Sequence, residues 1–361
     1  MKTQALAIAL LVCAQAATAQ DVAAQASVTL PSKDEAAKVL KAHKANSDTD
    51  VSRLAITSCN VLFGTETSAD SSTQGGFGSA SKPTSEARVS VSYTLQGMEP
   101  AALQALTETI CADAEAQLAA AGYQMVPAAE LATRAEFIKL HAGGKPTPYA
   151  YSRAGSKYNT YAPAGQQIYD LTYMGTADTF GSVFKTIGSG GSNSDEGALL
   201  TALNASGAHV NVMVDFAKAK GDKVKGFLSK IAGQDTAKVE AKMQLSVSGF
   251  VTLLPVKYVK CYGERCNLGG VGKETPLFTT EAPLLSGENA VLAVNDIQSN
   301  GSKLGVAAVN VLAVGMALSG YGSTTTSVTQ NGVVVDPAIY SSEVRRMAQQ
   351  FVGMAAVLSK P

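Results

Sequence analysis

The sequence predicts an α+β fold, in which an antiparallel or mixed sheet is covered by two to three helices and the C-terminal third adds β-hairpins. Three observations lead to this prediction. Several segments alternate apolar and polar residues, as half-buried strands do. Residues 100–121 and 341–359 repeat apolar residues every three or four positions, which is the period of an amphipathic helix. Turn signals rich in Gly, Ser and Asn-Gly separate the apolar segments of the last third.

The chain begins with the features of a secretory signal peptide. In MKTQALAIALLVCAQAATAQ, Lys2 precedes an apolar run, and small residues end at Ala19. We therefore expect residues 1–19 to be removed on export. Val12 stands before Cys13 where lipid-modified bacterial signals carry a small residue, so the pattern does not favour a lipid anchor.

The charge balance argues against nucleic acid as a partner. Charged residues make up 16% of the chain, and Lys2 is the only charged residue of the leader, so the mature chain keeps 28 of the 29 basic residues and all 29 acidic residues. A nearly neutral surface provides no electrostatic footprint for nucleic acid or for an anionic membrane. Abundant Gly, Ala, Ser and Thr with no Trp is typical of exported β-rich proteins.

Four cysteines remain after removal of the leader, and an even number in an oxidising compartment favours disulfides. Cys261 and Cys266 can close a small loop, which leaves Cys59 to pair with Cys111. Zinc is the competing interpretation. No Cys-x-x-Cys occurs and the chain has only three histidines, so we expect no metal.

The mature chain divides into an N-terminal polar helix and linker over residues 20–50 and a single α+β domain over residues 51–361. The pattern indicates a short surface helix over residues 33–47 and a buried strand over residues 53–63. The Gly- and Ser-rich residues 63–86 are typical of a flexible connection, and residues 88–95 alternate as a strand does.

The middle of the chain contains the clearest helix. Pro100 suits a first helical turn, Gly122 suits a cap, and residues 122–127 read as the next strand. Residues 145–175 are typical of a loop, whereas residues 179–187 and 196–206 have helical patterns. The glycine-rich GSGGSNSD between them could offer N–H groups to an anion, but a flexible joint is the commoner role of such a turn.

Two long ribbons follow, over residues 209–221 and 238–254. In KVEAKMQLSVSGFVTLL, apolar residues occupy one parity and polar residues the other, so we predict one long strand with an apolar face. That face can meet a core, a partner or lipid. Seventeen residues at ~3.3 Å span about 55 Å, which implies either a break near Gly249 or a strand that projects beyond the body.

The C-terminal part is β-rich over about residues 255–335 and closes with a helix over about residues 341–359. Asn331-Gly332 between two β-forming segments predicts a hairpin turn. Residues 304–318 carry Asn310 as their only polar residue and no charge. This run is too short for a spanning helix, so it can be a sheet centre, a helix on the sheet, or one leg of a hairpin inserted in a membrane.

No motif names a reaction, and we expect no catalytic, cofactor-binding or metal-binding residues. GGVGKET lacks the first glycine and the hydroxyl residue of a phosphate loop, because Asn267 and Glu274 stand at those positions. His43, His141 and His209 have no partner at metal-ligand spacing, and no Gly-x-Ser-x-Gly occurs. The sequence therefore predicts a protein that is not an enzyme.

The Tyr-rich segment is the candidate partner surface. Tyr is enriched at interfaces because it combines a large contact area with a hydroxyl group, although aromatic anchors can also fix a long loop to its own domain. The six tyrosines concerned are Tyr149, Tyr151, Tyr158, Tyr161, Tyr169 and Tyr173.

The order of elements resembles the curli-secretion channel family, whose periplasmic domain is related to the amino-terminal domain of the translocation protein TolB. The segments that carry this resemblance are RLAITSCNVLF, ALQALTETICADAEAQLAAAG, YQMVPAAEL, LLTALNASGAHVNVMVDFAKAKGD, VEAKMQLSVSGFVTLL and SSEVRRMAQQFVGMAAVL. The resemblance implies a ring-forming envelope protein whose hairpins line a secretion pore. Members of that family are lipid-anchored at an N-terminal cysteine, which this chain does not match.

We therefore expect a non-catalytic exported envelope protein, in the periplasm, at the outer membrane or outside the cell, that assembles with itself or binds protein partners. A secretion or assembly role at the outer membrane fits this interpretation. The alternative is a soluble periplasmic hydrolase or ligand-binding protein that uses a cleft near residues 149–173.

Overall fold

The computed structural model describes residues 28–43, 51–74, 86–153, 155–169, 191–224, 236–263, 265–268, 276–297, 303–304 and 325–360. The helices are α1 (Lys33–Val39), α2 (Pro100–Ala120), α3 (Ala128–Ala132), α4 (Ala135–Ala142), α6 (Gly191–Leu203), the short 3₁₀ helix η2 (Val256–Tyr258) and α8 (Pro337–Leu358). The first strands are β1 (Leu40–His43), β2 (Arg53–Gln74), β3 (Glu86–Gln96), β4 (Gln124–Met125), β5 (Tyr149–Arg153), β6 (Ser156–Tyr161), β7 (Ser206–Asp215) and β8 (Lys218–Val224). The later strands are β9 (Thr236–Lys242), β10 (Ser246–Leu254), β11 (Val259–Tyr262), β12 (Arg265–Leu268), β13 (Leu277–Thr280), β14 (Leu284–Leu285), β15 (Val291–Asp296), β16 (Lys303–Leu304) and β17 (Thr325–Val335).

One mixed sheet organises the molecule, and the predicted α+β class is confirmed. Its strands follow the order β1-β13-β10-β7-β2-β3-β17-β15-β16. Strand β2 is its axis, because β7 pairs in parallel with the first half of β2 and β3 pairs antiparallel with the second half. Strand β6 pairs with the middle of β2 on the opposite edge from β7, since both pair with residues 61–63.

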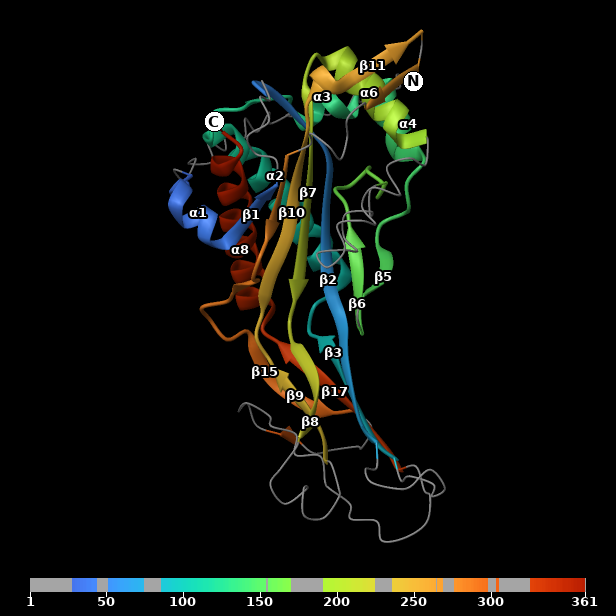
Figure 1. The fold of residues 1–361 in the computed structure, drawn as a ribbon, viewed down its shortest axis with the longest axis vertical. Coiled ribbons are helices and arrows are strands. Elements are labelled where there is room, and N and C mark those ends of the chain that lie inside the picture. The colour runs from blue at the N-terminus through green and yellow to red at the C-terminus, as the bar shows by residue number, and fades with distance from the viewer. Residues whose placement is uncertain are drawn as a thin grey trace, which may run out of the picture.

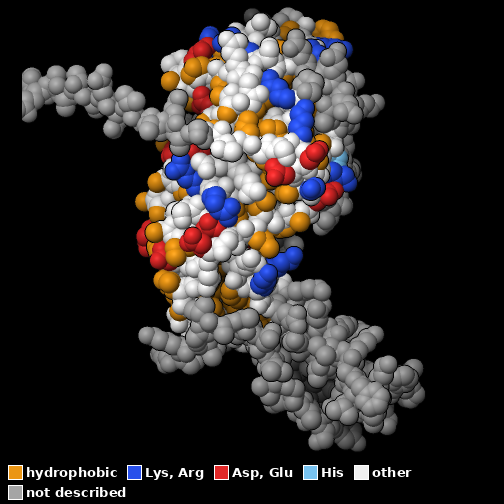
Figure 2. Space-filling view, turned by 90° about the vertical axis from the view of Figure 1, so that its left-hand side faces the viewer, with side chains coloured by type: hydrophobic (Ala, Val, Ile, Leu, Met, Phe, Trp, Pro, Cys, Tyr) orange, Lys and Arg blue, Asp and Glu red, His pale blue; other side chains and the backbone are white. Residues whose placement is uncertain are grey.

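Helices cover the sheet in two groups (Figure 1). Helices α1, α2 and α8 lie along one face, whereas α3, α4 and α6 gather at one end of the molecule together with β11. On the side where α1 and α8 lie, charges of both signs are interspersed with apolar side chains, which is typical of a solvated face (Figure 2). No helix among the described residues is long and apolar enough to cross a bilayer.

The two long helices form where the apolar period predicts them. In α2 the buried stripe runs through Leu103, Leu106, Ile110, Ala114 and Leu118. Helix α8 starts at Pro337, four residues before the expected start at residue 341. Its N-cap Asp336 accepts hydrogen bonds from the N–H groups of residues 338 and 339, and Pro at the first position needs no such acceptor.

The predicted single strand over residues 238–254 is wrong, because the ribbon is divided between two sheets. Strand β9 pairs with β8 in a separate sheet, and β10 pairs with β7 in the main sheet. The break is at Met243–Leu245 and not near Gly249. The preceding ribbon breaks in the same place, between Asp215 and Lys218, because β3 takes over the edge of β2 on which β7 ends.

The apolar face of the ribbon is covered by the chain itself. Val247, Val251 and Leu253 of β10 share a buried core with Met347 and Phe351 of α8. This face is therefore part of the core. The sequence alone had left open that it meets a partner or lipid.

Three segments expected to be loops or turns contain strands. Strand β2 continues to Gln74 through most of the predicted flexible connection, and β5 and β6 form a hairpin within the predicted Tyr-rich loop. Asn331-Gly332 is not a turn, since β17 runs through it and pairs with β3 and β15. Pairing on both sides overrides the local turn preference.

The N-terminal helix is shorter than expected and belongs to the folded body. Ser32 and Glu35 form a capping box at the start of α1, and the helix ends at Val39 instead of continuing to residue 47. The next residues form β1, which pairs with β13 along Leu40–His43. Residues 33–43 are therefore an edge of the main sheet with its helix.

Several long strands converge at the end of the molecule opposite to α3, α4 and α6 (Figure 1). The register places Thr73, Ala87 and Thr325 at one level of the sheet. The β8–β9 hairpin packs there, with Val239 buried in the same core as Val91 and Tyr93. We call this end, made of residues 66–74, 86–92, 218–224, 236–242 and 325–330, the strand-end pole.

Candidate functional site

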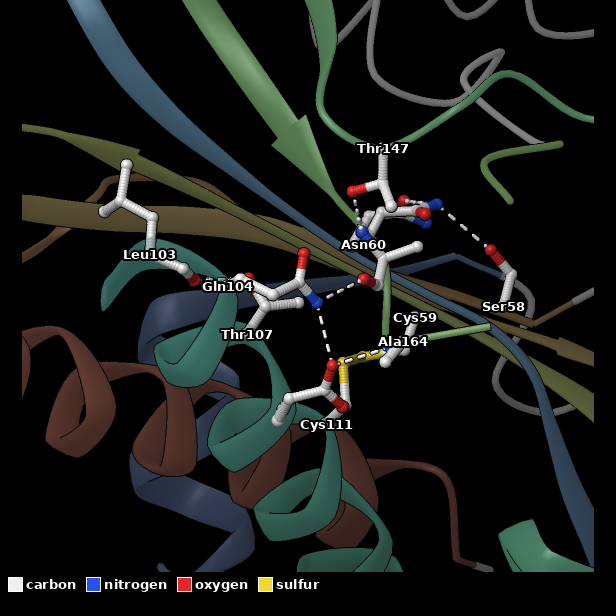
Figure 3. Close-up of a disulfide and its surroundings, with 12 residues drawn as sticks. Ser58, Cys59, Asn60, Leu103, Gln104, Thr107, Cys111, Thr147 and Ala164 are labelled. Carbon is white, nitrogen blue, oxygen red and sulfur yellow. Dashed lines mark hydrogen bonds between the residues drawn. A yellow bond between two sulfur atoms is a disulfide. The ribbon is translucent and has the colours of Figure 1, made fainter. Parts of the chain in front are cut away.

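The disulfide Cys59–Cys111 fixes α2 to the sheet (Figure 3). Cys59 lies on β2 and Cys111 on α2, 52 residues apart in the sequence, and they pair as expected from the two cysteines left over by Cys261 and Cys266. Nearby, the side-chain amide of Gln104 donates to the carbonyl oxygen of Ala162 at 2.9 Å. The disulfide and this hydrogen bond join β2, α2 and the end of β6.

The second disulfide, Cys261–Cys266, closes the β11–β12 hairpin. This hairpin lies against α6, where a Cβ on Gly197 would be 2.9 Å from the carbonyl oxygen of Cys266. Only glycine permits this close approach. Two disulfides indicate an oxidising, exported environment.

The six tyrosines do not form one surface. Tyr161 is 2% exposed and packs edge-on against Phe63 on the helix side, whereas Tyr158 is 5% exposed and donates to Asp215 at 2.7 Å on the other side. Tyr149 and Tyr151 are half-buried on β5. Tyr173 lies outside the described residues. The expected tyrosine partner surface is thus wrong for Tyr158 and Tyr161, which serve as aromatic anchors.

Among the described residues, a cluster of ionisable and hydroxyl side chains surrounds Glu196 of α6. One carboxylate oxygen, Oε1, accepts from the Thr57 hydroxyl at 2.5 Å and the Tyr169 hydroxyl at 3.1 Å, and lies 2.7 Å from Nε2 of His209. Glu196 is 2% exposed and His209 is 3% exposed. We call Thr57, His141, Tyr169, Glu196 and His209 the Glu196 cluster.

His141 of α4 completes this cluster. Its Nε2 lies 3.2 Å from the carbonyl oxygen of Thr57, and its Nδ1 lies 3.1 Å from the N–H and 2.7 Å from the carbonyl oxygen of Gln167. The ring also packs against Phe137 and Tyr169. Burial lowers the pKa of His141 below its ordinary value of 6.5, although hydrogen bonds to the backbone of Gln167 and Thr57 and the charge of Glu196 oppose this shift.

The Glu196 cluster can hold a proton and can connect secondary structures, but its geometry does not favour substrate chemistry. The carboxylate oxygen is already engaged by three groups of the same chain, of which Thr57 and His209 are buried and Tyr169 is partly buried. Among the described residues no three His, Cys, Asp or Glu side chains are placed to hold a metal ion. Helix α6, helix α4 and strands β2 and β7 all meet through this cluster.

Sequence reasoning missed this cluster. It placed His209 in a strand and residues 196–206 in a helix, but it assigned neither histidine a partner. Helix α6 begins at Gly191, within the predicted glycine-rich joint GSGGSNSD, and ends at Leu203, and β7 begins at Ser206. The available signal was Glu196 itself, a carboxylate at the start of the apolar run GALLTAL. A charge on an apolar helix face requires a buried partner.

The strand-end pole is the second candidate site. Strands β2 and β8 end at this pole, and strands β3, β9 and β17 begin there. The uncharged apolar run that includes residues 305–318 lies outside the described residues, between β16 and β17. Leu292 on β15 and Ile297, which follows that strand, are 54% and 46% exposed.

Comparison with known proteins gives no relative for this chain. No family model matches it, and no curated protein and no solved structure is significantly similar to it.

Proposed function

We propose that this protein is a non-catalytic exported component of a bacterial-type cell envelope that assembles with itself or with partner proteins at the outer membrane. The contacting surface is the strand-end pole. A secretion or assembly role, as implied by the resemblance to the curli-secretion channel family, is the form of this function that we favour.

The observation that carries the proposal is the convergence of long strands beyond the helical layer. Strand β2 has 22 residues, or about 70 Å at ~3.3 Å per residue, whereas an ordinary strand has 5–6 residues. The helices α2 and α8 accompany only part of this length (Figure 1). Among the described residues no helix covers this pole, and strand ends of this kind suit a contact with another chain or with lipid.

The composition of the segment that precedes β17 in the sequence supports the same function. Residues 305–324, which join β16 to β17, contain no charged residue. An apolar segment of this length that is connected to projecting strands is typical of a surface that another molecule covers. Exposed Leu292 on β15 and Ile297 directly after it extend the apolar character to the described residues.

The rival hydrolase or ligand-binding function would depend on the Glu196 cluster. Its carboxylate and imidazole are chemically suited to acid–base work. However, they are 2% and 3% exposed and are hydrogen bonded to each other, so a substrate would have to displace the contacts that hold α6. This comparison favours the non-catalytic function.

The test uses the full-length chain expressed in Gram-negative cells. We expect the product in the outer-membrane fraction, and we expect light scattering of the detergent-extracted protein to give a mass several times that of one mature chain. Replacing residues 305–318 by a Gly-Ser sequence of equal length should yield a soluble monomer with both disulfides intact.

The matched control changes the opposite end of the molecule. Tyr262 is 73% exposed on the β11–β12 hairpin, so Tyr262→Ser should leave assembly unchanged. A wild-type chain found as a soluble periplasmic monomer would overturn the proposal. Equal assembly by wild type and the 305–318 variant would remove the strand-end pole as its surface.

A further inference from the structure

The β11–β12 hairpin lies at the end of the molecule where α3, α4 and α6 gather, away from the strand-end pole (Figure 1). Tyr262 at the end of β11 is 73% exposed, more than any other large apolar side chain of the described residues. Lys257 in η2 and Lys260 in β11 are also exposed. We propose that this hairpin is a binding site for a carboxylate-bearing glycan of the cell envelope.

One face of the hairpin is turned towards α6. Cys266 is 8% exposed, and its carbonyl oxygen would lie 2.9 Å from a Cβ on Gly197. Sγ of Cys261 lies 3.6 Å from the hydroxyl oxygen of Thr201. Because Cys261 and Cys266 are directly opposite each other in the register, both cysteines belong to this face.

The other face carries the exposed residues. Lys260 and Tyr262 flank Cys261 along β11, and successive residues of a strand point to opposite faces. Lys260 and Tyr262 therefore share the face that is turned away from α6. The register places Arg265 opposite Tyr262 and Asn267 opposite Lys260 on β12. An aromatic ring is thus grouped with positions of basic and amide residues.

The hairpin is held in place although it contributes little to the core. All four residues of β11 are at least partly exposed. The Cys261–Cys266 disulfide and the four register pairs between β11 and β12 nevertheless fix its backbone. A surface that is ordered before binding loses less conformational entropy when a ligand arrives. This constraint therefore suits a rigid recognition surface.

The charge of this hairpin is positive. Residues 255–268 contain three basic residues and one acidic residue. Within the part of the chain that the structure describes, no carboxylate forms an ion pair with Lys257 or Lys260, and Nζ of Lys257 lies 5.2 Å from the centre of the Tyr258 ring. Ammonium groups placed in this way attract an anionic ligand, even though the whole chain is nearly neutral.

The size of the surface favours a glycan over a folded protein. A tyrosine buries about 150–250 Å² when it is covered, whereas each partner in a stable protein interface buries ~800 Å². One hairpin matches a sugar unit, whose C–H face can pack on the Tyr262 ring while its carboxylate pairs with a lysine. A polymer of such units gains affinity because it offers many copies. This site is separate from the proposed assembly surface and requires only export, which the two disulfides indicate.

The experiment is a sedimentation assay with the purified mature chain and peptidoglycan sacculi, which are an insoluble carboxylate-bearing glycan. We expect the wild-type chain to pellet with the sacculi and to be released as the salt concentration is raised, because salt screens exposed charges. Amylose resin provides sugar rings without carboxylates, and polyglutamate coupled to agarose provides carboxylates without sugar rings. We expect retention on each of these two probes to be at least about tenfold weaker, because each lacks one of the two kinds of contact.

Two variants of the hairpin test which groups bind. Tyr262→Ser should weaken binding to the sacculi at least about tenfold, as expected when an aromatic anchor is removed. Lys257→Gln combined with Lys260→Gln should weaken binding and should also reduce its dependence on salt. All of these side chains are exposed, so circular dichroism should show an unchanged fold in both variants.

Two control variants keep the hairpin intact. Ile138→Ser removes an apolar side chain that is 58% exposed on α4, and Lys218→Gln combined with Lys242→Gln removes two exposed lysines of the strand-end pole. Both controls should bind the sacculi as the wild type does. Binding by a control that is as weak as that of Tyr262→Ser would overturn the inference.

Other results would also overturn it. These are no binding of the wild type to sacculi, unchanged binding by either hairpin variant, or equal retention on amylose or polyglutamate. Vesicles of phosphatidylcholine and phosphatidylglycerol test for a lipid partner, and vesicle binding that falls in Tyr262→Ser would replace the glycan by lipid. Since Tyr262→Ser should leave assembly unchanged, a failure of the proposed assembly function would be seen separately.

Discussion

Single residues decide how closely the layers of this protein approach each other, and Gly249 of β10 is the clearest case. A Cβ at this position would be 2.3 Å from the carbonyl oxygen of Asn211 and 2.9 Å from the ring of Phe351. The ring can shift, but the carbonyl belongs to the paired strand β7. The absence of a side chain is what lets α8 rest on the sheet.

Gly249→Ala should therefore destabilise the fold by about 1–3 kcal/mol, the usual cost of overpacking a core. Urea unfolding followed by circular dichroism measures this free energy. Gly143→Ala is the matched control, because its Cβ would meet only the carbonyl oxygen of Leu140, at 3.9 Å. Equal stability of the two variants would contradict the role given to Gly249.

A second residue, Glu343 of α8, holds the loop that follows β14. Its carboxylate accepts from Arg346 at 2.9 Å and from the Ser286 hydroxyl and the Gly287 N–H, both at 2.8 Å. The hydrogen bond from Arg346 is the largest cause that lowers the pKa of Glu343 from 4.5 to about 2. The ionised form is thus strongly favoured in the folded protein.

Glu343→Gln should cost about 2 kcal/mol of unfolding free energy at pH 7, because hydrogen bonds to a charged group are lost. Since the folded pKa is depressed, this contribution is present above 4.5 and is lost as the pH falls towards about 2. Urea unfolding at pH 7 and pH 3 should show a smaller difference between wild type and variant at pH 3. An equal difference between wild type and variant at both pH values would contradict the role given to the ionised Glu343.

At the scale of elements, the two disulfides stabilise different amounts of structure. Cys59–Cys111 closes a loop with a sequence separation of 52 and joins β2 to α2, whereas Cys261–Cys266 has a separation of 5 within one hairpin. The entropy removed from the unfolded chain grows with loop length. The first disulfide should therefore contribute more to global stability.

Replacing Cys59 and Cys111 together by Ala should lower the unfolding free energy by about 4 kcal/mol, and replacing Cys261 and Cys266 by about 2 kcal/mol. Chemical unfolding under non-reducing conditions gives both values. The second pair is the control for the first. A larger loss from the hairpin disulfide would contradict the loop-length argument.

The helices and strands also show which parts of the secondary structure can be predicted from local sequence patterns. Helix α2 and the strands β2, β3 and β7 were predicted near their observed positions, because the period of apolar residues is local information. The break at Met243–Leu245 was not predicted, since the apolar parity continues through it: Val239, Met243 and Leu245 all join the same core. The ribbon is divided into β9 and β10 because β3 occupies the edge of β2 at the point where β7 ends.

At the scale of the whole molecule, the two candidate sites occupy opposite ends (Figure 1). The Glu196 cluster joins the helices α4 and α6 to the sheet at one end, and the strand-end pole lies at the other. Strand β2 extends from one to the other, since it contributes Thr57 near its start and Gln74 at its end. The proposed assembly surface and the Glu196 cluster can therefore be changed separately by substitution.

The sequence by itself determined the α+β class, the helix over residues 100–120, the division of cysteines into two pairs and the absence of a recognisable reaction motif. These depend on periodicity, counting and short spacing, which are properties of neighbouring residues. Tertiary structure alone decided that Asn331-Gly332 is not a turn, that Tyr158 and Tyr161 are buried, and that Glu196 meets His209 and Thr57. Thr57 and Glu196 are 139 residues apart in the chain, and only the packing of α6 on β2 and β7 brings such groups within hydrogen-bonding distance.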